Sequence, residues 1–371
     1  MDPRSDRHPG SDPQRIDVRL SDPGEIVASL PALLGFRPRE SVVLVGLTGA
    51  SGGRVGLTVR GDLPPPEDAA AAAAVLTRSV RTDRPSGVLV AVVTEAPDVP
   101  EAGGPGRGPD GGASGLPHRD VVHELVLALA RDGVAVCAAL LVRAGRWWSY
   151  DCPRPCCAPG AGTPLPEGVT TLEVASVATG VVVERDRSDL VRRITGPVGP
   201  ARDDMAAVCA RVAVECSARV LETGFDAVAE ESFAAVTAAA ARCRPGAPRR
   251  ALTDREVARV VWGLRDRDVR DRALGLAIGA DAPAAEVLWT ECTRRAPAPL
   301  DAAPATLLAV SAWLRGDGAL ANVALARALD VEPAYALARL LAQALARCVP
   351  PAELRAMIGT TLASPGASRP G

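Results

Sequence analysis

The segment GVLVAVVTE, Gly87–Glu95, decides the fold class of this chain. Its residues are almost continuously apolar and rich in valine, which is typical of a strand covered on both faces of a sheet. The preceding stretch, 66–82, begins with proline and two acidic residues and continues in alanine, so it is predicted to be a helix. A helix followed by a buried strand indicates an α/β fold.

Other elements on both sides of this pair extend it into an α/β domain predicted for residues 15–197. Ser21 or Asp22 is expected to cap a first short helix, and Gly133 to end a later one. We expect helices at 21–34 and 118–132, hairpin strands at 41–47 and 54–60, and a second pair of strands at 134–143 and 146–152. The predicted sheet is mixed, has about five strands and packs against helices, while its strand order stays open.

The second half of the chain lacks strand patterns and is predicted to be an α-helical array over residues 198–360. Within it, 305–338 resembles a tetratricopeptide hairpin, with Gly316-Asp317 at the turn and Ala321, Ala328 and Pro333 at the small and exit positions. One copy is too short for a solenoid, so we expect a packing hairpin. The remaining stretches are predicted to be disordered tails at 1–14 and 361–371, a helix near 172–180, and a mobile Pro/Gly-rich insertion at 97–117.

Composition excludes several classes of enzyme and partner. The 42 basic residues are all arginine, so a pyridoxal Schiff base and a phosphate-loop lysine are both excluded. A formal net charge of −2 gives no electrostatic reason to expect a nucleic acid or a membrane as partner. The polar N-terminus lacks the apolar stretch of a signal peptide, and nine scattered cysteines fit reduced thiols, so we expect a cytoplasmic protein.

The segment GRWWSYDCPRPCCAPGAGTPL, Gly145–Leu165, concentrates reactive side chains. Cys152, Cys156 and Cys157 offer three thiolates for a metal such as zinc, on a loop that two prolines stiffen. Adjacent cysteines seldom bind the same ion because their side chains diverge, and no fourth ligand is evident. A metal site, a redox or disulfide pair and a packed loop therefore stay open as interpretations, and the packed loop is favoured.

Two aromatic residues of the same segment are candidate ligand-binding residues. Trp147 and Trp148 are consecutive on a strand and must point to opposite faces, so one is expected in the core. Trp148 shares its face with Tyr150, whose hydroxyl either contacts a ligand or caps a buried carbonyl.

The loop GFRPRES, Gly35–Ser41, is the dense polar cluster beside a predicted core strand. Arg37, Arg39, Glu40 and Ser41 are candidates for an anion-binding site, since arginine pairs bind anionic groups well. A solvated turn between helix and strand is the favoured alternative.

Several of these stretches together resemble a known bacterial family. They are DPGEIVASLPALLGFRPRESVVLVGL and the cysteine-containing segment, with VRDRALG and WLRGDGALANVALARAL downstream. In these residues the chain resembles the family of domain of unknown function 4192, from about Ile16 to Glu353. The resemblance implies no reaction, cofactor or catalytic residue.

Function is left to hypotheses of different classes. No Gly-rich dinucleotide motif, nucleophile elbow or carboxylate-rich metal cluster is present, which favours a non-enzymatic scaffold whose helical domain binds a protein partner. The alternative is an enzyme or small-ligand protein with a cleft near GFRPRES and WWSYDC. A minor alternative is a thiol or metal switch at the cysteine loop.

Overall fold

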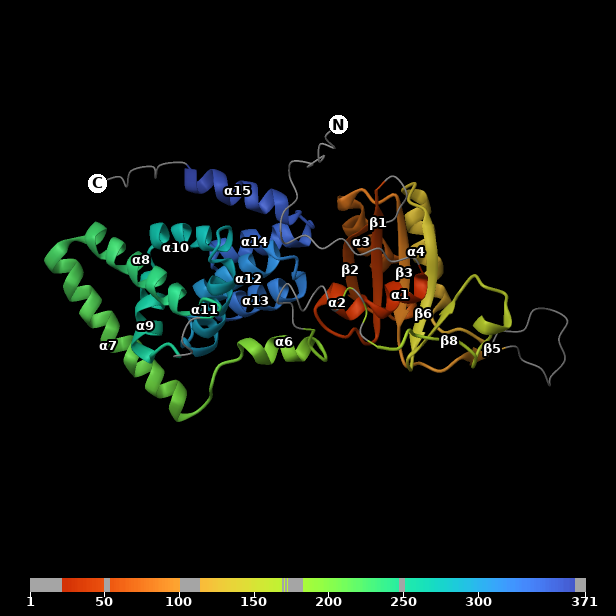
Figure 1. Ribbon diagram of the computed structural model, residues 1–371, viewed down its shortest axis with the longest axis horizontal. Coiled ribbons are helices and arrows are strands. Elements are labelled where there is room, and N and C mark those ends of the chain that lie inside the picture. Colours follow the sequence, from red (N-terminus) through yellow and green to blue (C-terminus); the bar gives the residue numbers. More distant parts are fainter. Residues whose placement is uncertain are drawn as a thin grey trace, which may run out of the picture. The chain divides into compact units, whose positions relative to one another are not determined.

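The computed structural model describes residues 22–49, 54–100, 114–168, 170, 172, 183–246 and 251–363. The chain divides after Arg185 into two compact units, an α/β unit and a helical unit, which are described separately (Figure 1).

The α/β unit is built on one mixed sheet. Its strands are β1 (Ser41–Thr48), β2 (Arg54–Asp62), β3 (Gly87–Val93), β6 (Val136–Arg143), β7 (Arg146–Ser149) and β8 (Thr163–Pro164), in the order β2-β1-β3-β6-β7-β8. β3 and β6 are parallel, and the other neighbours are antiparallel. The mixed sheet is confirmed, with a sixth strand that the sequence did not reveal. β8 pairs through two residues and includes a proline, so it carries no alternating pattern.

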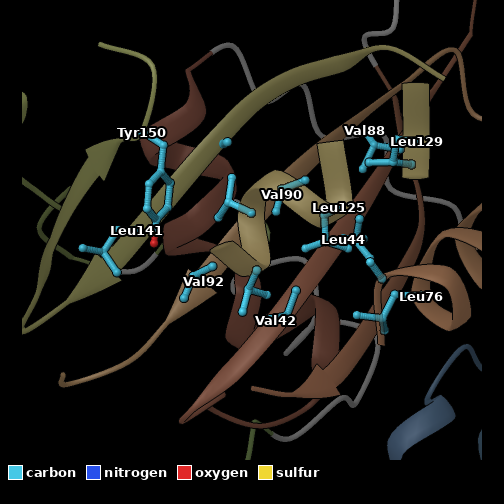
Figure 2. Packing of buried hydrophobic residues seen from close by; sticks show 14 of the residues in the cluster. Val42, Leu44, Leu76, Val88, Val90, Val92, Leu125, Leu129, Leu141 and Tyr150 are labelled. Atoms are coloured by element: carbon cyan, nitrogen blue, oxygen red, sulfur yellow. The ribbon is translucent and has the colours of Figure 1, made fainter. Parts of the chain in front are cut away.

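Helices cover both faces of this sheet, as the apolar character of Gly87–Glu95 predicts. On one face α3 (Ala69–Val80) and α4 (Arg119–Arg131) pack against side chains such as Val42, Val90 and Leu141 (Figure 2). On the other face α1 (Pro23–Ala28) and α2 (Leu30–Leu34) pack against Val43, Leu89 and Leu140. Neighbouring residues of β1, β3 and β6 thus alternate between two apolar layers, as the period of a strand requires.

Local turn chemistry explains where these elements begin and end. The helix expected at 21–34 is broken into α1 and α2, because Pro31 has no N–H to continue the helical hydrogen bonds. Asp22 is the N-cap of α1, and its carboxylate accepts a hydrogen bond from the Gly24 N–H at 3.2 Å. The β6–β7 hairpin turns at Ala144 and Gly145, both with positive φ.

Both described ends of the predicted insertion 97–117 make contacts with the rest of the α/β unit. β4 (Val99–Pro100) pairs with β5 (Ser114–Gly115), and Leu116 is buried in the core. The Asp98 carboxylate lies 2.8 Å from the Arg143 guanidinium. The buried Leu116 and the Asp98–Arg143 ion pair thus hold both described ends of a segment whose Pro/Gly-rich sequence indicates a loop. Residues 101–113 lie outside the described residues.

The helical unit confirms the predicted all-α region. Its helices are α6 (Arg187–Ile194), α7 (Pro200–Thr223), α8 (Phe225–Arg242), α9 (Asp254–Gly263), α10 (Arg267–Leu274), α11 (Ala282–Arg295), α12 (Ala302–Leu314), α13 (Gly318–Val331), α14 (Ala336–Ala346) and α15 (Pro351–Ala363). α6 belongs to this unit, since Arg193 pairs with Glu286 of α11 at 3.4 Å. The boundary therefore lies at Arg185/Asp186, earlier than the predicted 197/198.

A helical hairpin stands where the tetratricopeptide-like segment was predicted. Gly316, with φ +91°, and Asp317 form the turn between α12 and α13, and Asp317 caps α13 by accepting from the Leu320 N–H at 2.9 Å. Ala321 and Ala328 are fully buried, which lets the two helices approach closely. The hairpin is thus present, and its kinship with tetratricopeptide repeats stays a prediction.

Three predicted segments lie wholly or partly outside the described residues. The predicted tail 1–14 and most of the helix expected near 172–180 lie outside the described residues. The predicted tail 361–371 begins inside α15, which continues to Ala363.

Candidate functional site

The cysteine loop is anchored to the sheet by the strand that precedes it. The Trp148 indole N–H donates to the Ala158 carbonyl at 3.2 Å, and the Ser149 N–H donates to the Cys157 sulfur at 3.3 Å. A short 3-10 turn at Pro155–Cys157 folds the chain back toward β7. Arg146 donates to the carbonyls of Ala161 and Gly162 and holds the far end of the loop.

These contacts bring the three cysteine sulfurs together. The Sγ atoms of Cys152, Cys156 and Cys157 all lie within 4.8 Å of one another, and those of Cys156 and Cys157 are 3.9 Å apart. The expected divergence of adjacent cysteines does not occur, because the turn at Pro155–Cys157 takes the two residues out of an extended conformation. Cys156 is exposed, Cys152 is half-buried and Cys157 is buried.

The thiols differ in acidity. A hydrogen bond from the Arg154 backbone N–H lowers the pKa of Cys152, and the neighbouring sulfurs act in the same direction. Burial raises the pKa of Cys157 to about 11. Cys152 is therefore the readier nucleophile or metal ligand of the two at neutral pH.

Trp148 and Tyr150, predicted as ligand contacts, are parts of the core. Trp148 is 3% and Tyr150 6% exposed, and both belong to the apolar layer beneath α3 and α4, where Tyr150 lies near Leu141 (Figure 2). The Tyr150 hydroxyl donates to the buried Pro117 carbonyl at 2.7 Å, which is the capping role that the sequence left open. Trp147 points to the opposite face, where it packs near Gly24 of α1.

The GFRPRES loop uses two of its four candidate side chains within the fold. The Glu40 carboxylate accepts from the Thr94 hydroxyl at 2.8 Å and from the Glu95 N–H at 2.9 Å, joining the start of β1 to the end of β3. Ser41 is buried and donates to the Arg39 carbonyl at 2.6 Å. Arg37 and Arg39 have exposed side chains.

The two segments predicted to line one cleft lie on separate parts of the sheet. β1 and β7 are separated by β3 and β6, which places them roughly 14 Å apart. Ser41 pairs with Val93, which pairs with Val142, near one end of these three strands. Tyr150 lies beside Ala139, and the chain continues from there away from that end of the strands. The structure thus brings the three cysteines together and does not bring GFRPRES to them.

Sequence reasoning missed an apolar groove in the helical unit, which we call the helical groove. It has a volume of about 740 Å³ and lies between the end of α7, the start of α8 and the α9–α10 connection. Its apolar lining includes Val220, Leu221, Phe225, Val228, Ala229 and Trp262. Leu221 and Phe225 are 89% and 68% exposed, so large apolar groups face solvent here.

Leu221 lies near the end of α7, outside the buried stripe of that helix, and Phe225 is the first residue of α8. That stripe is Met205, Cys209, Val212 and Cys216, at helical spacing. In the sequence, this groove could have been predicted only from an apolar residue, such as Leu221, that lies outside the buried stripe of an amphipathic helix. That indication is weak, because single exposed apolar residues are common.

The rim of the helical groove carries charges and an unused donor. Arg265 and Arg267 line it with exposed side chains that form no ion pair within the described part of the chain. The Trp262 indole N–H is buried and has no acceptor among the described residues. Asp266 accepts from the backbone N–H groups of Asp268 and Val269 as the cap of α10.

None of the described helices combines the length and apolar character required to cross a membrane. Comparison with curated proteins and with solved structures gave no match. Residues 23–352, nearly the whole chain, match the family described as domain of unknown function (DUF4192). This match agrees with the resemblance that the sequence shows in several stretches, including Gly145–Leu165. This protein therefore belongs to the DUF4192 family.

Proposed function

We propose that this protein is a non-enzymatic protein-binding module whose helical unit holds an apolar segment of a partner protein in the helical groove. One observation carries the proposal: Leu221 and Phe225 are 89% and 68% exposed beside the helical groove of about 740 Å³. Large apolar side chains around a groove are typical anchors of protein interfaces.

The polar groups of the rim define the partner more closely. The guanidinium groups of Arg265 and Arg267 form no ion pair with any described residue, which favours an acidic residue next to the apolar anchor. Asp266 and Asp268 lie on the same rim and balance the two guanidinium groups in formal charge, so one carboxylate of the partner fits better than a run of them. A carbonyl oxygen of the bound segment would also supply the acceptor that the Trp262 indole lacks.

The α/β unit supports the alternative of a small-ligand or catalytic cleft less well. Glu40, Ser41 and Tyr150 use their polar atoms in hydrogen bonds of the fold itself. A site built on them would have to break those bonds before it contacted a ligand. The free thiols of the chain fit a reducing compartment, which supports the proposed cytoplasmic location.

Selection from a displayed library of random peptides on the full chain tests this function. We expect the enriched peptides to share an apolar anchor and one acidic residue, and to lose binding to Phe225→Asp. Phe225 is the first residue of α8, where a carboxylate suits the helix N-terminus, so this variant should stay folded.

Leu340→Asp is the matched control, because Leu340 is 64% exposed on α14 and does not line the groove. Peptides that bind wild type and Phe225→Asp equally, or a selection without enrichment, would overturn the assignment.

A further inference from the structure

The three sulfurs of the cysteine loop have the spacing of ligands around one metal ion. Metal–sulfur bonds of about 2.3 Å place two thiolates about 3.8 Å apart in tetrahedral and about 4.0 Å apart in trigonal coordination. The Cys156 and Cys157 sulfurs are 3.9 Å apart, within this range. The Cys152 sulfur lies within 4.8 Å of both, so a shift of about 1 Å or less completes the triangle.

Local backbone contacts hold the loop in this arrangement. Pro153 and Pro155 restrict the backbone on both sides of Arg154, and the Cys157 N–H donates to the Arg154 carbonyl at 2.9 Å. The Ser149 N–H bond to the Cys157 sulfur is of the kind that orients thiolates in metal sites. A preformed loop reduces the ordering that metal binding would otherwise require.

We infer that Cys152, Cys156 and Cys157 form a binding site for one thiophilic d10 metal ion, Cu(I) or Zn(II), on the α/β unit. Thiolate ligands select these ions over hard cations. Three sulfurs complete a trigonal Cu(I) site but leave zinc one ligand short, so we expect the tighter binding for Cu(I). This inference is independent of the helical groove, which lies in the other unit.

Binding is a proton exchange without a change of oxidation state. Each thiol loses its proton to solvent as its sulfur bonds to the ion. Cys156 is exposed, which provides access for the ion from solvent or from a thiol carrier.

Competition titration of the full reduced chain tests the site, with bicinchoninate for Cu(I) and a pyridylazo dye for Zn(II). We expect native mass spectrometry to show one ion per chain, and X-ray absorption to show three sulfurs at about 2.3 Å from Cu(I). Cys152→Ser and Cys156→Ser should each weaken binding more than tenfold. Neither side chain is buried, so both variants should fold.

Cys137→Ser is the matched control, since Cys137 is an exposed cysteine on β6 outside the cluster. It should bind the ion as wild type does. If the wild-type chain takes neither Cu(I) from bicinchoninate nor Zn(II) from the pyridylazo dye, the inference is overturned. Equal affinity in wild type and in both cluster variants would also overturn it, because the ion would then bind at other thiols. Tighter binding of Zn(II) than of Cu(I) would contradict the three-coordinate site.

Discussion

The Tyr150 hydroxyl donates a buried hydrogen bond of 2.7 Å to the Pro117 carbonyl, and thereby ties the end of β7 to the residues that lead into α4. Tyr150→Phe leaves that carbonyl buried without a donor. We expect the α/β unit to lose about 1–3 kcal/mol of unfolding free energy, measured by urea denaturation, with hydrogen exchange assigning the transition to each unit. Tyr335→Phe, in the helical unit, should leave the transition of the α/β unit unchanged.

Gly162 tests how the cysteine loop depends on its packing against Trp148. Its φ is +72°, and a Cβ there would lie 2.4 Å from the Trp148 ring. Gly160 has a similar φ of +78° but no neighbour within 4 Å of a Cβ. Gly160→Ala should therefore cost about 1 kcal/mol and Gly162→Ala about 2–4 kcal/mol in the same denaturation experiment. Equal losses would show that the indole does not confine the loop.

Cys152 and Cys157 should differ in reactivity at neutral pH. At pH 7 a limiting amount of iodoacetamide should modify Cys152 before Cys157, because the pKa of Cys152 is lowered and that of Cys157 is raised. Peptide mass spectrometry gives the ratio. Preferential modification of Cys157 would contradict this order.

The raised pKa of Cys157 also predicts a loss of stability in alkali. Below pH 9.0 the thiol is protonated in both states, whereas between 9.0 and about 11 it ionises in the unfolded chain first. The folded state therefore loses stability as pH rises through this window. Thermal melts of wild type and Cys157→Ala should show a smaller alkaline decline in the variant.

An ion pair between a buried carboxylate and a partly exposed guanidinium joins the start of α12 to α13. Asp301 is fully buried before α12, and its carboxylate lies 2.7 Å from the Arg327 guanidinium of α13. Arg327→Met should destabilise the helical unit by about 3–5 kcal/mol, because it leaves a buried charge unpaired. The double variant Arg327→Met/Asp301→Asn should recover part of the loss. Urea denaturation measures both, and no recovery would argue against the charge as the cause.

Local patterns predicted the elements that short-range physics determines. The valines of Gly87–Glu95 indicated a strand covered on both faces, and the alternation of Trp147 and Trp148 indicated their opposite environments. Both follow from the period of a strand, which needs no knowledge of the partner strands. The order of the strands depends on pairings between distant residues, and β8 and the burial of Leu116 follow from the same long-range packing.

The candidate site was predictable in composition but not in geometry. The sequence identified Cys152, Cys156 and Cys157, but extended-chain reasoning predicted divergent side chains for the adjacent pair. Hydrogen bonds from Trp148 and Ser149 to the loop, which span residues eight to ten positions apart, bring the sulfurs together. The exposure of Phe225 likewise depends on which face of α8 its neighbours leave open.

The β4–β5 pairing also bears on how chain length can vary in this family. Val99 and Gly115 are joined at the base of the connection between β3 and α4, next to the Asp98–Arg143 ion pair and the buried Leu116. Residues added between these two strands leave all three contacts in place and add only loop-closure entropy, about 0.6 kcal/mol for each doubling of the loop. This clasp makes the position between β4 and β5 suitable for inserting an epitope or a fluorescent domain, and a place where relatives can differ in length while keeping the same core.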